Sequence, residues 1–325
     1  MNAKNKKSVG ALLAKPATAD RASVTPAWWL GSFLLLRTAA ALCSLTVLLA
    51  GCAAPKVVYF GPSDAKPSAV PAEVQRVAAE AARKQGLQLF GLVPCKSKDA
   101  AQRWAAVAAQ GDANKGFVQA RSFLFLETNG SARLVATSEA LNDPRFGEPI
   151  EQAHLWIKAV DLDGDGTDEI VIDTGFQGAS WAPDCAFVFR AAPTGLVHLA
   201  TLCSHDDVSL TGYDRQQRLA VAVEYCVGSD EIGHVNQPRW VDYFGCESGR
   251  VGLVNGKFKD TYQGLRKELQ ETVAKYPRDG ELWFYLGRAH ELLGDPQTAQ
   301  TSFATARKLG YRERSAQEFF GGRFK

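Results

Sequence analysis

The sequence lacks a strong excess of charge of either sign. Its 325 residues include 37 Lys and Arg against 35 Asp and Glu, a formal net charge of +2 at pH 7. Proteins that bind nucleic acid neutralise several phosphates with clustered basic residues, and no basic stretch or nucleic-acid-binding motif is found here. We therefore expect no nucleic-acid partner.

Histidine is also scarce, with five residues, and no recognisable active-site motif accompanies it. The segment 178–182 has Ala182 where a nucleophile elbow requires glycine. His205 and His234 stand near acidic residues, but at no familiar metal-ligand spacing. We therefore expect a non-enzymatic protein. The alternative is a hydrolase or ligand-binding protein whose site lies in loops carrying Trp181, Asp184, His205, Glu231 and His234.

A long uninterrupted apolar run is missing as well. The 24 residues from Trp28 to Gly51 are long enough to span a bilayer, but Arg37 lies in the middle of them. A charge at that depth costs about 2.5–3.5 kcal/mol on insertion scales. An uncleaved anchor helix is therefore the weaker interpretation of this segment.

The end of the apolar run has a more specific pattern. Basic residues precede Thr38–Leu49, as in a secretory signal, and the run closes on Leu49-Ala50-Gly51-Cys52. These four residues resemble the lipobox of bacterial lipoproteins. The resemblance implies a signal peptide over 1–51 and a mature chain that begins at lipidated Cys52, with diacylglycerol on the thiol and an N-acyl group such as palmitate. Ala53 in place of Asp implies the outer membrane, if the source is Gram-negative.

The mature chain differs from the leader in charge and composition. Six of the Lys and Arg and one of the Asp and Glu precede Cys52, so 31 basic residues face 34 acidic residues after it. Residues 52–71 contain four prolines and read as a tether between lipid and fold. The remaining length is sufficient for one large or two small domains.

The other cysteines favour an oxidising compartment. Cys185 and Cys203 flank two apolar runs joined by a turn at 192–195, so a hairpin sets them opposite each other. Cys226 and Cys246 each end a strand-like segment. We predict the disulfides Cys185–Cys203 and Cys226–Cys246; ordinary buried thiols are the alternative, because spacing does not fix connectivity.

The pattern of apolar residues predicts an α+β fold that is mainly antiparallel β, with a short N-terminal helical part and C-terminal helices. Residues 73–85 and 99–110 are alanine-rich and predict two helices. Residues 72–259 form the β-rich domain in this interpretation, and Asn255-Gly256 predicts a two-residue hairpin. Strands are predicted at 117–127, 133–138, 154–160, 169–173, 185–190, 195–202, 218–225, 239–244 and 250–258.

The most specific chemical motif is Asp161-Leu-Asp-Gly-Asp-Gly-Thr-Asp-Glu169. Carboxylates at alternating positions with glycines between them can direct hard oxygens at one cation, which is what Ca²⁺ prefers. Ile172 stands where an EF-hand requires glutamate, and strand-like segments flank the loop. The segment resembles the calcium hairpin of FG-GAP repeats. That resemblance implies calcium ligands from Asp161, Asp163, Asp165, Glu169 and the carbonyl of Thr167.

We find one copy of this motif, and a closed propeller needs at least four blades. We therefore expect a β-sheet domain with a single calcium hairpin in which the ion is structural. An acidic Asp-Gly turn without an ion is the alternative interpretation.

Residues 280–311 carry a second resemblance. Trp283, Leu286, Gly287 and His290, followed by Ala299, Phe303 and Ala306, match the spacing of the tetratricopeptide repeat. The resemblance implies two antiparallel helices within the segment 260–325 and a surface for a protein partner, to which we assign Trp283, Tyr285, His290 and Phe303. A C-terminal capping hairpin without a partner is equally consistent with the pattern. The expected function is thus a lipid-anchored, calcium-stabilised interaction or assembly module.

Overall fold

The computed structural model describes residues 57–58, 70–99, 101–112, 114–143, 153–176, 184–192, 195–204, 206–212 and 218–312. The chain divides into two units, Met1–Ala54 and Pro55–Lys325, and every element described here belongs to the second. The predicted signal peptide, Cys52 and most of the predicted tether lie outside the described residues. None of the described helices is both long and apolar enough to cross a membrane.

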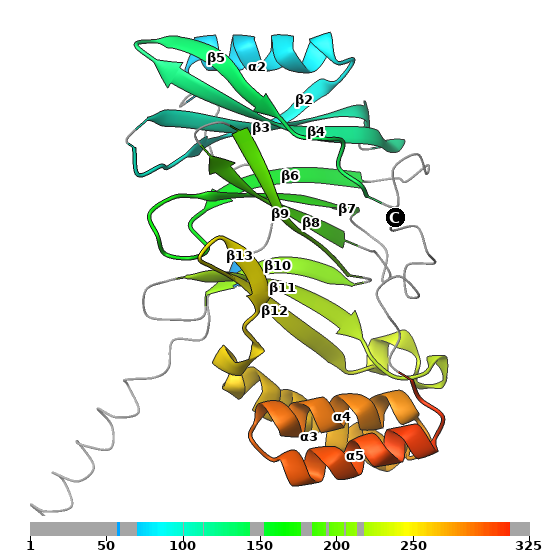
Figure 1. Cartoon of the computed structure of the whole chain (residues 1–325). Helices are drawn as coiled ribbons and strands as arrows, with labels where there is room; N and C mark the ends of the chain where they lie inside the picture. Colours follow the sequence, from blue (N-terminus) through cyan, green and yellow to red (C-terminus); the bar gives the residue numbers. More distant parts are fainter. Residues whose placement is uncertain are drawn as a thin grey trace, which may run out of the picture. The chain divides into compact units, whose positions relative to one another are not determined.

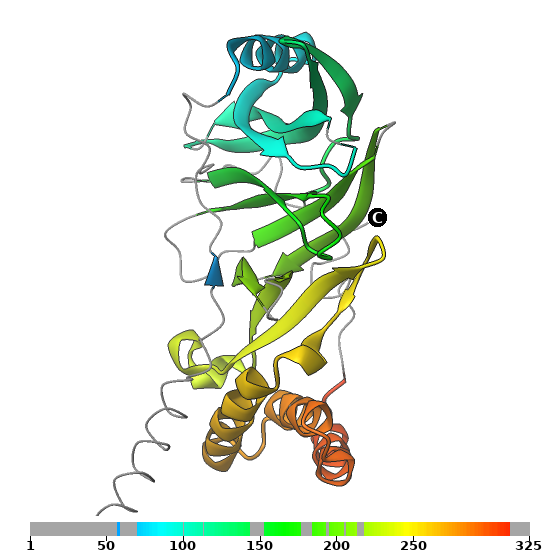
Figure 2. The same cartoon turned by 90° about the vertical axis from the view of Figure 1, so that its left-hand side faces the viewer.

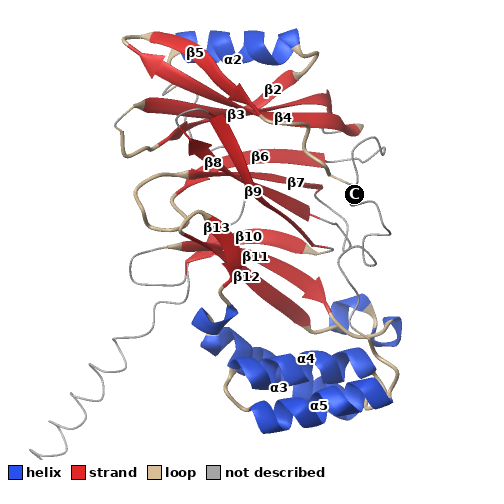
Figure 3. Ribbon diagram, viewed as in Figure 1, coloured by secondary structure: helices blue, strands red, loops and turns tan. Residues whose placement is uncertain are grey.

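Three antiparallel sheets make up most of the second unit (Figures 1 and 3), which confirms the mainly antiparallel α+β class. The first sheet has the order β2 (Gln88–Cys95), β3 (Gln102–Asp112), β4 (Gly116–Thr128), β5 (Ser131–Thr137). The middle sheet has the order β6 (Ala153–Val160), β7 (Glu169–Phe176), β8 (Asp184–Ala192), β9 (Gly195–Ser204). The third sheet has the order β1 (Val57–Val58), β10 (Asp207–Gly212), β11 (Leu219–Cys226), β12 (Arg239–Glu247), β13 (Arg250–Leu253).

The sheets pack face to face. Successive side chains of a strand point to opposite faces of its sheet, so the strands of the middle sheet contribute to two cores. In β7, Ile170 and Ile172 enter the core shared with the first sheet, whereas Val171 enters the core shared with the third. Helix α2 (Ala72–Lys84) covers the outer face of the first sheet. Helices α3 (Lys259–Lys275) and α4 (Gly280–Leu292) cover the outer face of the third (Figures 1 and 2).

The helix predicted at 73–85 is confirmed by α2, but the one predicted at 99–110 is wrong. That segment forms β3, in which Arg103 to Ala109 are all buried. A strand buried on both faces needs small or apolar residues throughout. Alternate alanines of β3 pack on α2 and on the middle sheet, so tertiary packing overrides the helix propensity of alanine.

The hairpin predicted at Asn255-Gly256 is also wrong. These residues lie in the 3-10 turn η4 (Asn255–Lys257), and the Asn255 side chain accepts the Tyr243 N–H at 2.7 Å. The hairpin before β13 instead turns at Ser248-Gly249, whose φ values are 51° and 76°. Positive φ at both positions is typical of a type I′ turn.

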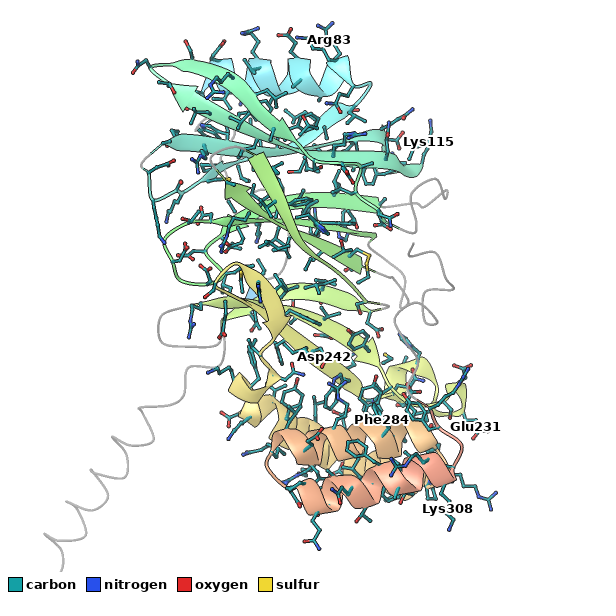
Figure 4. The ribbon with its side chains drawn as sticks, viewed as in Figure 1. Arg83, Lys115, Glu231, Asp242, Phe284 and Lys308 are labelled. Atoms are coloured by element: carbon teal, nitrogen blue, oxygen red, sulfur yellow. A yellow bond between two sulfur atoms is a disulfide. The ribbon has the colours of Figure 1, made fainter. Side chains whose placement is uncertain are left out.

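The C-terminal helices dock on the third sheet through Trp240 and Tyr262, whose rings lie 5.1 Å apart. Asp242 of β12 accepts the Trp240 indole N–H at 2.9 Å and lies 3.6 Å from the guanidinium of Arg288 on α4 (Figure 4). Helix α5 (Pro296–Lys308) folds back on α4, where Phe284 meets Phe303 at 5.6 Å. Helices α3 and α4 therefore pack on the third sheet, and α5 packs on α4.

Candidate functional site

The acidic loop connects β6 to β7, as predicted, and brings three of its carboxylates together. Ligand oxygens of Asp161, Asp163 and Asp165 lie within 4.8 Å of one another. The backbone N–H of Asp165 donates to Asp161 at 3.0 Å and to Asp163 at 3.1 Å. Gly164 and Gly166 have φ values of 73° and 86°, a conformation that glycine adopts without strain, so the loop can turn back on itself.

Glu169 is engaged differently. Its side chain has no exposed surface, and Oε1 lies 2.5 Å from Nη2 of Arg190 on β8. Its other oxygen accepts the Leu162 N–H at 3.0 Å. Burial raises the pKa of Glu169 despite the nearby guanidinium. The structure thus places this predicted ligand in a buried ion pair, beside the three-carboxylate group.

Arg190 also reaches Asp163, with Nη2 2.6 Å from Oδ2. A second cation, Lys98, lies 3.1 Å from the Asp165 carboxylate. Burial raises the pKa of Asp165, but hydrogen bonds from Lys98 and the Thr167 N–H outweigh it and hold this pKa below its ordinary value. Asp161, Asp163 and Asp165 are the loop residues whose oxygens lie close enough together to hold one hard cation.

The predicted disulfide between Cys185 and Cys203 is confirmed. The two residues are directly opposite each other in β8 and β9, with their Cα atoms 4.1 Å apart. Because Cys185 is fully buried between the first and middle sheets, the bond lies in the core. This crosslink joins neighbouring strands of the middle sheet.

The predicted disulfide between Cys226 and Cys246 is wrong, and both cysteines are free. Cys226 ends β11 and Cys246 is the last residue but one of β12, but these strands are antiparallel and Cys226 pairs with Arg239 at the start of β12. Cys246 lies seven residues farther along, or about 24 Å at the rise of an antiparallel strand. Buried Cys95 is the third free cysteine of the described chain.

Of the four residues assigned to a partner surface, His290 is buried, and Trp283, Tyr285 and Phe303 are half-buried. Trp283 and Tyr285 pack against the core beneath the third sheet, and His290 is buried beside Asp295. Phe303 lies against Gly287, where an added Cβ would come within 2.6 Å of its ring. These side chains therefore serve mainly the internal contacts of the helix pair, and the partner surface assigned to them stays a prediction.

A second group of side chains lies where β10 begins and β11 ends. Cys226 Sγ is 3.3 Å from Asp206 Oδ1 and 3.9 Å from His234 Nε2, and those two atoms are 3.4 Å apart. Burial and the Asp206 carboxylate raise the pKa of Cys226 to about 12. A nucleophilic cysteine needs a lowered pKa, so this thiol is poorly suited to attack a substrate.

Two other residues of the alternative site, Asp184 and Glu231, do not belong to this group. Asp184 is buried at the start of β8, in a separate group with His154 and Asp173. Glu231 is exposed on η2 (Asp230–Ile232; Figure 4). Trp181 and His205 lie outside the described residues.

Sequence reasoning missed Arg190 and the approach of Cys226 to His234. Neither has a local signal, because Arg190 follows Glu169 by 21 positions and the thiol, imidazole and Asp206 come from separate segments.

Comparison of the chain with protein-family models, with curated proteins and with solved structures finds no match.

Proposed function

We propose that the chain is a lipid-anchored protein of the bacterial cell envelope, stabilised by calcium, that acts as an interaction or assembly module. The observation that carries the location is the buried Cys185–Cys203 disulfide, since such bonds persist in oxidising compartments and are rare in the cytosol. The lipobox-like residues ending at Cys52 supply the anchor. Thioether and N-acyl chains together give stable membrane attachment.

The calcium proposal rests on the Asp161, Asp163 and Asp165 carboxylates and on the FG-GAP-like spacing. In this proposal the ion is held by these oxygens and the Thr167 carbonyl, while Arg190 neutralises Glu169. The ion would stabilise the β6–β7 turn and take part in no reaction. Extracellular calcium modules work at millimolar ion concentrations, which suits an envelope protein.

For the partner surface we turn from these four side chains, which serve mainly internal contacts, to the outer face of α5. This helix packs mainly on α4, and Thr301, Ala304 and Lys308 are exposed on it. In tetratricopeptide arrays a further helix covers such a face. We infer that a protein partner covers it in this chain.

Lipidation tests the location. The full chain is expressed in a Gram-negative host supplied with an alkyne-tagged fatty acid, and the wild type is expected to carry the label. Cys52→Ser should lose the label and keep its leader, whereas Cys43→Ser, a matched change within the leader, should keep the label. Label retained in Cys52→Ser would contradict the anchor.

Titration calorimetry tests the ion on the detergent-solubilised full chain. The wild type should bind one Ca²⁺, and Asp165→Asn should weaken binding at least about tenfold, because it removes a charged ligand. Asp112→Asn is the control, since Asp112 also accepts backbone N–H groups in a turn. Equal binding by the wild type and Asp165→Asn would refute the site.

Site-specific photo-crosslinking tests the partner. A photoreactive residue at Ala304 on α5 is expected to capture a defined protein in cells, whereas one at Ala79, an exposed alanine of α2, should not. Equal capture at both positions would contradict a docking surface on α5.

A further inference from the structure

The group formed by Asp206, Cys226 and His234 offers one carboxylate, one thiol and one imidazole. It lies at the end of β11, remote in sequence from the acidic loop and made of different residue types. Hard cations such as Ca²⁺ take oxygen ligands, whereas zinc takes thiolate, imidazole and carboxylate together. We propose that these three residues form a zinc site with a fourth position open to solvent.

The spacing of the three ligand atoms fits a single tetrahedral ion. Zn–S of about 2.3 Å and Zn–N and Zn–O of about 2.0–2.2 Å place neighbouring ligand atoms about 3.4–3.6 Å apart. The observed separations are 3.3 Å from sulfur to oxygen, 3.4 Å from nitrogen to oxygen and 3.9 Å from sulfur to nitrogen. Small side-chain rotations are enough to bring all three atoms to bonding distance.

The carboxylate is already oriented for this role. Asp206 Oδ2 accepts the Cys226 backbone N–H at 2.5 Å, which leaves Oδ1 facing the thiol and the imidazole. The Asp206 backbone N–H donates to Ser204 Oγ at 2.9 Å, and that hydroxyl donates to the Glu224 carbonyl. Such hydrogen bonds behind a ligand fix its direction and strengthen metal binding.

The histidine is held by the loop between β11 and β12. Ile232 is buried in the core beneath the third sheet, and Gly233, with φ 71°, turns the chain into η3 (His234–Asn236). The Gln237 side chain closes this loop on the Gly228 carbonyl at 2.9 Å. The imidazole therefore lies on a loop anchored at both ends.

The charge of the three ligands and their access to solvent also suit a zinc ion. Thiolate and carboxylate together balance the two charges of Zn²⁺, so the metal-bound group is neutral. The Asp206 side chain is 3% exposed and that of His234 is 23% exposed, which gives an ion access from the histidine side. A nucleophilic Cys–His pair is less consistent with the geometry, because the thiol donates to the carboxylate instead of the imidazole.

Zinc and cobalt ions are the probes, added to the full chain in detergent with calcium present to compete at the acidic loop. The wild type is expected to bind one zinc ion. With Co²⁺ it should show the near-ultraviolet absorption of a cobalt–thiolate bond. Cys226→Ser should abolish the band and weaken zinc binding at least about tenfold. Cys246→Ser, which alters another free cysteine, should change neither.

Asp206→Asn should also weaken zinc binding, but Asp206 is buried and this variant can fail to fold. His234→Ala then decides between the outcomes, because it keeps every cysteine and changes a partly exposed position. It should weaken zinc binding at least about tenfold and diminish the cobalt band, with an unchanged circular dichroism spectrum. A wild type without the band would overturn the site. So would a band that persists in Cys226→Ser, or zinc binding that is unaffected by His234→Ala.

Discussion

Arg190 joins two carboxylates that come from opposite ends of the acidic loop. The side chains of Asp163 and Glu169 are 6% and 0% exposed, and the same Nη2 atom contacts both. An arginine in this position neutralises charge that the surrounding core cannot solvate. The turn between β6 and β7 is thus held by a residue of β8 as well as by its own hydrogen bonds.

Replacing Arg190 should therefore be costly. Arg190→Met leaves two buried carboxylates without their cation, and we expect a loss of about 3–5 kcal/mol in the free energy of unfolding in calcium-free buffer. Urea denaturation measures it. Adding calcium should restore part of the loss, because Glu169, no longer paired with Arg190, can join the other loop carboxylates around the ion.

Lys98 provides the matched control. It also pairs with a loop carboxylate, but its side chain is 63% exposed, and exposed ion pairs contribute about 0–1 kcal/mol. Lys98→Met should change the stability by less than about 1 kcal/mol. Equal losses in the two variants would show that burial of the Arg190 pair is unimportant.

The Cys185–Cys203 disulfide should also contribute to the free energy of unfolding. Cys185 and Cys203 are 18 positions apart, and closing a loop of that size in the unfolded chain stabilises the folded state by about 3 kcal/mol. The double variant Cys185→Ala/Cys203→Ala should lose about that amount in urea denaturation. Reductant should destabilise the wild type and leave the double variant unchanged. If reductant added to the unfolded wild type left its free energy of unfolding unchanged, that result would contradict the disulfide.

At the level of elements, apolar patterning predicts strands well where their neighbours are also strands. Residues 154–160 and 185–190 match β6 and β8 within two residues at each end. Asp99–Gln110 fails because local propensity does not reveal that α2 and the middle sheet bury both faces of β3. The two predicted cysteine pairs show the same limit. Both pairs lie on neighbouring antiparallel strands. Cys185 and Cys203 lie near opposite ends of their strands and meet, whereas Cys226 and Cys246 both lie near the far ends of theirs and are kept apart.

The Asp279 side chain ties the start of α4 to the loop after β11. Asp279 Oδ1 accepts the N–H groups of Glu281 and Leu282 at 3.0 and 3.1 Å, and Oδ2 accepts the Ser229 N–H at 2.6 Å. A capping residue satisfies donors that the helix itself leaves unpaired. Asp279 therefore both caps α4 and holds the segment after β11.

Asp279→Ala removes both functions and should cost about 1–2 kcal/mol of the free energy of unfolding. Asp279→Asn retains an oxygen for the helix cap but puts an amide N–H₂ group opposite the Ser229 N–H, so its loss should be smaller. Thermal or urea denaturation of the two variants checks the order. A larger loss in the asparagine variant would contradict the assignment of the cap.

At the level of the whole second unit, the packing of the first sheet on the middle sheet depends on a glycine. A Cβ on Gly91 of β2 would lie 2.5 Å from Cγ2 of Ile157 on β6 and 3.4 Å from Val107. These atoms belong to the core between the two sheets. Protein interiors are packed densely enough that such a contact forces neighbouring side chains or the backbone to move.

Gly91→Ala should therefore lower the free energy of unfolding by about 1–3 kcal/mol. Gly252→Ala on β13 is the control, because nothing lies within 4 Å of a Cβ at that position, and it should be nearly neutral. In a double-mutant cycle, Gly91→Ala should cost less in the Ile157→Ala background, since the atom it meets is gone. Simple addition of the two losses would mean that the sheets do not meet at this glycine. Favourable coupling would establish direct packing of β2 on β6, which the sequence does not contain as a local pattern.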